Sequence, residues 1–193
     1  MAQKINFRVI YDRTRELLLH PQREWQKIEE EEDNAKSLFR EYILPLGIIT
    51  SIVVLLLGFL SYTPWQTVFY AFTNFISVTA GTYVAFLITR EYLNNRISDS
   101  ETTALHLTVY SSGIFIIFHS LSIALVSGFL SQLAGLASLL FLRTLYIGIY
   151  RMTDLPANYK TNTLVIMTLS IICLPVILTK LFMILFHIPA FNL

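Results

Sequence analysis

Two long runs without a single Asp, Glu, Lys or Arg dominate the pattern of polar and apolar positions. The first run covers residues 42–89 and is 48 residues long, and the second covers residues 102–142 and is 41 residues long. One crossing of a bilayer needs about 20 apolar residues, so each run has room for two crossings and a turn. The pattern therefore predicts two helical hairpins inside a membrane.

Turn residues divide these runs, and one more apolar segment follows them. The sequence 62–65 (Tyr-Thr-Pro-Trp) separates the first two crossings, and Gly128 separates the next two. We predict five spans, at about residues 43–61, 66–89, 106–127, 129–149 and 163–186. The expected fold is an all-α polytopic membrane protein, with a five-transmembrane-helix bundle over residues 43–193.

Residues 1–42 are the one sizeable segment outside the predicted spans. Apolar side chains recur in it at helical spacing, at Phe7, Ile10, Tyr11, Leu17 and Leu18. This spacing predicts a cytoplasmic amphipathic helix that lies among lipid headgroups, followed by a second helix that starts at Pro21. The acidic run 29–33 is expected to point into water or to serve as a docking patch for a basic partner.

The basic residues are distributed unevenly about the predicted spans. Thirteen of the fourteen Lys and Arg residues fall on the N-terminal side of the membrane, and Lys180 alone falls on the other. Such a bias places the N-terminus in the cytoplasm and the C-terminus outside. A mean hydropathy of +0.59 agrees with a polytopic membrane protein, and a net charge of +1 argues against nucleic acid as a partner.

The segment before the first span also carries a recognisable motif. Residues 21–29 read Pro-Gln-Arg-Glu-Trp-Gln-Lys-Ile-Glu, and residues 40–46 read Arg-Glu-Tyr-Ile-Leu-Pro-Leu. Together with the five-span layout, these residues resemble bacterial members of the Yip (Ypt/Rab-interacting protein) family. The resemblance implies a multi-pass protein of the inner (cytoplasmic) membrane. The aspartate-leucine-x-glycine-proline motif of eukaryotic members is absent before the first span.

The sequence offers few groups that could carry chemistry. No carboxylate falls inside a predicted span, which argues against ion-coupled transport. HExxH, GxSxG and Walker motifs are absent, and Cys173 is the single cysteine. We therefore expect neither an enzyme nor a bound cofactor or metal.

Several polar residues near the spans are candidates for a functional or packing role. His119 lies midway along the third span, either hydrogen-bonded to a neighbouring helix or acting as a relay or ligand. Arg143 lies inside the fourth span, where it either extends to the headgroups or pairs with Glu91 or Asp154. Arg90 lies at the end of the second span.

A stripe of small residues, Ser77, Gly81 and Ala85, runs along the second span beside Asn74. Such stripes let helices approach closely, either within one bundle or between two copies in a homo-oligomer. In the N-terminal segment, Trp25 and Ile28 share one helical face and form a small apolar contact.

Two functions remain open from the sequence. The first is a non-enzymatic membrane-organising or partner-binding protein that contacts the bilayer and binds a protein through residues 1–42. The alternative is a small passive channel or carrier for a solute or lipid. Its path would be lined by polar residues of the second and third spans: Thr73, Asn74, Ser77, Ser111, Ser112 and His119.

Overall fold

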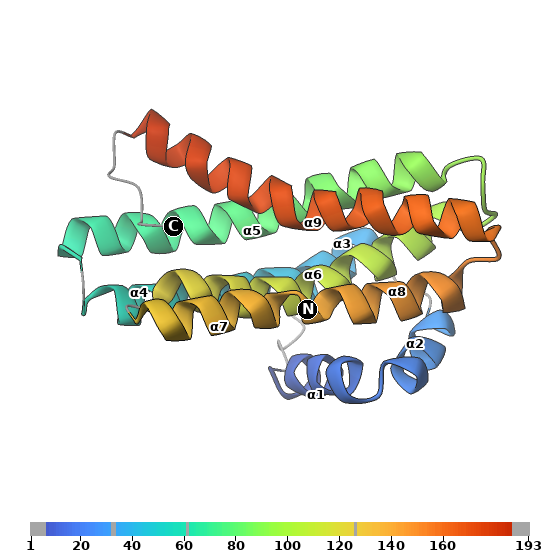
Figure 1. Cartoon of the computed structure of the whole chain (residues 1–193), viewed down its shortest axis with the longest axis horizontal. Coiled ribbons are helices and arrows are strands. Elements are labelled where there is room, and N and C mark those ends of the chain that lie inside the picture. Colours follow the sequence, from blue (N-terminus) through green and yellow to red (C-terminus); the bar gives the residue numbers. More distant parts are fainter. Residues whose placement is uncertain (1–6, 32–33, 61, 126, 187–193) are drawn as a thin grey trace.

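The computed structural model describes residues 7–31, 34–60, 62–125 and 127–186, and these ranges contain helices but no strand. The elements, in chain order, are α1 (Phe7–Leu19), α2 (Pro21–Glu29), α3 (Ala35–Leu38), the π-helical turn η1 (Phe39–Ile43), α4 (Leu44–Gly58), α5 (Pro64–Leu93), α6 (Ser100–Ala124), α7 (Gly128–Ser138), α8 (Leu140–Met152) and α9 (Ala157–Leu185) (Figure 1). The prediction of an all-α polytopic membrane protein is confirmed.

Five helical stretches are long and apolar enough to cross a membrane. They are Ala35–Gly58, Pro64–Leu93, Ser100–Ala124, Gly128–Met152 and Ala157–Leu185. The first begins eight residues before the predicted span and the fifth begins six residues before it, because the helices continue through polar residues such as Lys36 and Lys160. The first stretch is continuous through α3, η1 and α4, and the fourth through α7 and α8.

The turn between the first two spans ends in a capping box. Thr63 accepts a hydrogen bond from the Gln66 backbone, the Gln66 side chain accepts one from the Thr63 backbone, and Pro64 occupies the first position of α5. This arrangement satisfies backbone groups that helix starts leave without partners. It explains why α5 begins at this point.

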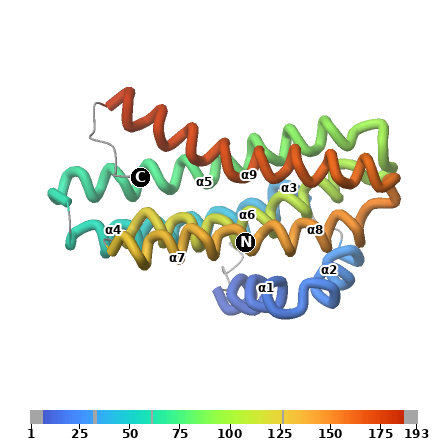
Figure 2. Tube along the Cα trace, in the orientation of Figure 1, coloured from blue at the N-terminus to red at the C-terminus, as the bar shows by residue number. Residues whose placement is uncertain are grey.

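The spans run along the long axis of the molecule, and their connections gather at two ends (Figure 1). The connections α5–α6 and α8–α9 lie at one end, which we call the charged end because Arg96, Asp99 and Asp154 lie in those connections. Helices α1 and α2 lie against one side of the bundle, with α2 toward the charged end (Figure 2). Both short helices therefore have the bundle as a packing surface.

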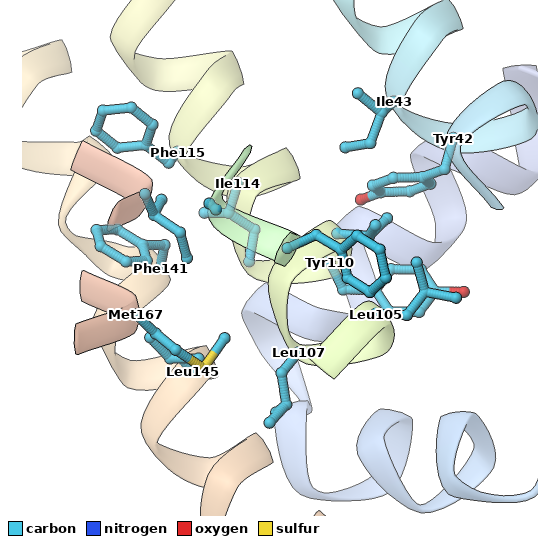
Figure 3. Packing of buried hydrophobic residues seen from close by; sticks show 14 of the residues in the cluster. Tyr42, Ile43, Leu105, Leu107, Tyr110, Ile114, Phe115, Phe141, Leu145 and Met167 are labelled. Carbon is cyan, nitrogen blue, oxygen red and sulfur yellow. The ribbon is translucent and has the colours of Figure 1, made fainter. Parts of the chain in front are cut away.

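One hydrophobic core joins these short helices to the spans. Figure 3 shows part of it, where Tyr42, Ile43 and Tyr110 lie near one another and Phe115, Phe141 and Leu145 lie on the other side of α6. Buried side chains of α1 and α2 belong to the same cluster: Ile10, Leu17, Trp25 and Ile28. Helices on both sides of the predicted boundary at residue 42 therefore share one core.

The orientation of α1 differs from that of a helix lying free among headgroups. Ile10 and Leu17 turn toward the bundle, where they are 5% and 0% exposed, while Phe7 and Tyr11 are 56% and 65% exposed. The apolar residues of α1 thus divide between two faces, and the inward face is covered by protein. Contact with lipid headgroups stays a prediction for the outward face, where Phe7 and Tyr11 are exposed.

The small-residue stripe on α5 is filled from within the chain. Ser77 and Ala85 are fully buried, and a β-carbon built at Gly81 would lie 2.8 Å from Cγ of Pro175 in α9. The sequence left packing inside one bundle or between two copies open for this stripe, and at Gly81 the structure has close packing inside the bundle. Oligomeric state stays a prediction.

Candidate functional site at the charged end

Trp25 joins α2 to the bundle. Its side chain is 0% exposed, and its Nε1 donates a hydrogen bond of 2.9 Å to the Thr144 carbonyl of α8. A β-carbon built at Gly148 would lie 2.7 Å from the indole ring, so the ring needs a residue without a side chain there. The indole also meets the Tyr110 ring edge-on, with centroids 6.2 Å apart. Burial of a large aromatic side chain and a satisfied N–H group together hold α2 in place.

Two further hydrogen bonds attach α1. The Thr144 hydroxyl donates to the Leu17 carbonyl at 3.4 Å, so Thr144 contacts both short helices. The Thr14 and Tyr42 hydroxyls lie 2.8 Å apart and are buried. Helix α1 is therefore bonded to the first and fourth spans, which lie far apart in the sequence.

Arg13 forms the electrostatic centre of the same region. Its guanidinium lies 2.8 Å from the Glu24 carboxylate and 2.5 Å from the Glu31 carboxylate, and it lies over the Tyr110 ring at 5.5 Å. The side chains of Arg13 and Glu24 are 18% and 5% exposed, and Lys27 approaches Glu24 at 2.7 Å. Breaking such a group by removing one partner leaves a charge uncompensated in a poorly hydrated place.

The charge on Arg13 is secure at every accessible pH. Burial alone would lower the pKa of Arg13, but the interaction with Tyr110, the hydrogen bond to Glu31 and the carboxylate charges of Glu31 and Glu24 outweigh burial and raise that pKa above its ordinary value. The guanidinium therefore holds α1 and α2 together as a permanent cation. Its role here is attachment, because both of its carboxylate partners belong to the N-terminal segment.

A cleft of about 1030 Å³ opens beside this region. Its walls come from the end of α2, the α5–α6 connection, the start of α6 and the α8–α9 connection. Arg96 and the buried His106 line it, together with four carboxylates: Glu29, Glu31, Asp99 and Asp154. The N-terminal segment therefore forms one wall of an acidic hollow.

Three of the charged candidates from the sequence lie at this end. Asp154 lines the cleft, Glu91 is exposed, and the Arg90 guanidinium lies 5.8 Å from the centre of the Phe86 ring. The structure does not form the suggested ion pair of Arg143 with Glu91 or Asp154. Arg143 is exposed and its Nη1 donates to the Leu18 carbonyl at 3.4 Å, because docked α1 brings that carbonyl within reach.

The remaining candidates lie deeper in the bundle. Asn74 is buried and bridges three spans, since its Nδ2 donates to the Ser51 hydroxyl and its Oδ1 accepts from the Ser120 hydroxyl, both at 3.1 Å. His119 stacks on Phe115 with centroids 4.8 Å apart. None of these residues lines the cleft at the charged end.

The sequence analysis missed most partners of Trp25. Thr144 and Gly148 lie in an apolar span, where a small residue has many uses and no spacing points to a tryptophan more than a hundred residues away. Arg13 and Glu24 could have been suspected, because both lie in short amphipathic helices that a tight turn at His20 folds against each other. Nothing in the sequence around Tyr110 distinguishes it from its apolar neighbours as a partner of Trp25.

A family model, described as the Yip1 domain, matches residues 15–184. The chain belongs to the Yip1 domain family. The match covers the end of α1, all of α2 and almost the whole length of the five spans, so the resemblance read from residues 21–29 and 40–46 is confirmed for the family. Comparison with curated proteins and with solved structures gives no match. This member of the Yip1 family is an integral, multi-pass membrane protein whose tryptophan helix packs on its fourth span.

Replacing Trp25 tests the attachment of α2. We expect Trp25→Ala to lower the free energy of unfolding in detergent by about 3–5 kcal/mol, because it empties a fully buried aromatic site. The matched control is Trp65→Ala, since Trp65 is 73% exposed and should lose about 0.5 kcal/mol or less. Equal losses for the two variants would show that α2 is not held by its tryptophan.

Proposed function

We propose that this Yip1-family protein is a non-enzymatic membrane-organising protein that binds protein partners at its charged end. The observation that carries the proposal is the burial of Trp25 against α8, which fixes α2 beside the cleft. A partner would then meet one preformed surface, made of the outer face of α2 and the walls of the cleft. Preformed surfaces bind more tightly because less ordering is needed on contact.

The charges of the cleft favour a partner with a basic segment. Glu31 is paired with Arg13 and Glu29 with Arg151, while Asp99 and Asp154 are exposed and carry no ion pair in the ranges that the structure describes. Because Glu29 and Glu31 are balanced by their arginines, the two unpaired aspartates against Arg96 leave the cleft with a net negative charge. Such a charge speeds the encounter with cationic partners and selects among them.

We also propose that the charged end faces the cytoplasm of a bacterial cell and that the C-terminus lies outside the inner membrane. Support comes from the thirteen cations on the side of the N-terminus against Lys180 alone on the other. A periplasm-dependent reporter fused after Leu193 should be active, and the same reporter fused before Met1 should be silent. The opposite pattern would overturn this orientation and move the cleft to the outer face.

Neutralising the cleft tests partner binding in the full-length protein. We expect Asp99→Asn/Asp154→Asn to reduce at least fivefold the proteins cross-linked to the chain in its own membrane, because the attraction for basic segments is lost. The matched control is Glu41→Gln/Glu91→Gln, which removes two exposed carboxylates that do not line the cleft. An unchanged set of cross-linked proteins in the cleft variant would count against the proposal.

The alternative of a passive channel or carrier has one observation in its favour. Six buried hydroxyls have no hydrogen-bond partner within the described ranges and would accept water, and four of them belong to the predicted path: Thr73, Ser77, Ser111 and Ser112. Against it, Asn74 is engaged with Ser51 and Ser120, and neither Asn74 nor His119 lines the cleft at the charged end. If vesicles reconstituted with the protein conduct a solute, and Asn74→Leu abolishes that solute flux, the channel or carrier function would be supported.

A further inference from the structure

Two adjoining clefts follow the line where α2 packs on α8. One has a volume of about 350 Å³ and the other about 540 Å³, and Arg23 and Ile147 line both. Arg143 lines the first, and Arg151 lines the second together with Tyr146 and Tyr150. Arginines more than a hundred residues apart in the sequence therefore meet along one line on the surface.

The lining of these clefts is positively charged. Neither lining contains a carboxylate, whereas three guanidiniums face it. Arg151 forms an ion pair with Glu29 at 2.8 Å, but Arg143 donates only to the neutral carbonyl of Leu18. The side chain of Arg23 has no hydrogen bond or ion pair with any residue in the described part of the chain, and it is exposed. Planar guanidiniums with free N–H groups bind phosphate through two parallel hydrogen bonds.

The face of the helix that carries Arg143 is graded from apolar to polar. Toward the far end of the bundle, exposed leucines occupy the same face at helical spacing: Leu136, Leu139 and Leu140, which are 65%, 43% and 45% exposed. Toward the charged end, Tyr146 and Tyr150 are each 47% exposed. Tyrosines of this kind favour the headgroup level and leucines favour acyl chains, so the face follows the profile of a lipid leaflet.

We propose that the line between α2 and α8 binds the phosphate headgroup of an anionic phospholipid. The headgroup phosphate contacts Arg23 and Arg143, and the acyl chains lie along the exposed leucines below. Basic pockets between membrane helices bind lipid headgroups in this way. The leucines are the reason to assign a lipid rather than a soluble phosphate, which would leave them without a role. The site is separate from the acidic cleft and goes beyond the function proposed above.

Lipid retention by the purified full-length protein tests the site. The protein is mixed in detergent with equal amounts of phosphatidylglycerol and phosphatidylcholine and washed. Native mass spectrometry then identifies the lipids that stay bound. We expect phosphatidylglycerol to be retained at least fivefold over phosphatidylcholine. Arg23→Gln/Arg143→Gln should reduce this preference to about one, and Arg40→Gln/Arg96→Gln, which removes the same charge elsewhere at this end, should leave it intact.

Arg23→Gln alone provides a second variant, because the Arg23 side chain supports no other part of the described structure. It should lower the preference at least twofold at an unchanged melting temperature. Retention of phosphatidylglycerol by the double variant at the level of the control would overturn the proposal. Displacement of the lipid by soluble glycerol phosphate at equal concentration would also overturn it, because the site would then recognise a free phosphate ester.

Discussion

The contact of Trp25 with α8 is the interaction on which the charged end depends. A tryptophan needs both a large apolar site and an acceptor for its N–H group. In α8 the Thr144 carbonyl is the acceptor, and Gly148 leaves the space that the indole ring fills. With α2 fixed in this way, Arg13 can pair with Glu24 and Glu31, and α1 can place Ile10 and Leu17 in the core. Without the contact of Trp25 with α8, these side chains would be exposed to water or lipid.

The membrane architecture follows from the sequence because the bilayer allows few solutions. Long runs without charge must be helical where no water can satisfy the backbone, so residues 42–89 and 102–142 had to form hairpins. The exact helix ends could not be read in the same way. Helices such as α9 begin before the apolar run, because polar residues like Asn158 and Lys160 are tolerated in a helix that leaves the membrane.

The site was only partly predictable, for a physical reason. Trp25 stood out because it shares an apolar helical face with Ile28 and belongs to the motif of residues 21–29, and the structure buries it completely. Its acceptor and its space lie in a span where nearly every residue is apolar, and there the sequence carries no pattern that selects Thr144 or Gly148. For Arg143 the sequence left contact with headgroups or an ion pair open. The ion pair does not form, and the observed acceptor is the backbone carbonyl of Leu18, which the docked position of α1 brings near.

This arrangement packs α1 and α2 onto the membrane domain, and backbone hydrogen exchange measures directly how firmly α2 is held there. In lipid nanodiscs, amides of α2 (Pro21–Glu29) should exchange as slowly as those of α8 and at least tenfold more slowly than those of the α5–α6 connection. Exchange in α2 as fast as in that connection would contradict the account, because the tryptophan helix would then spend its time away from the bundle.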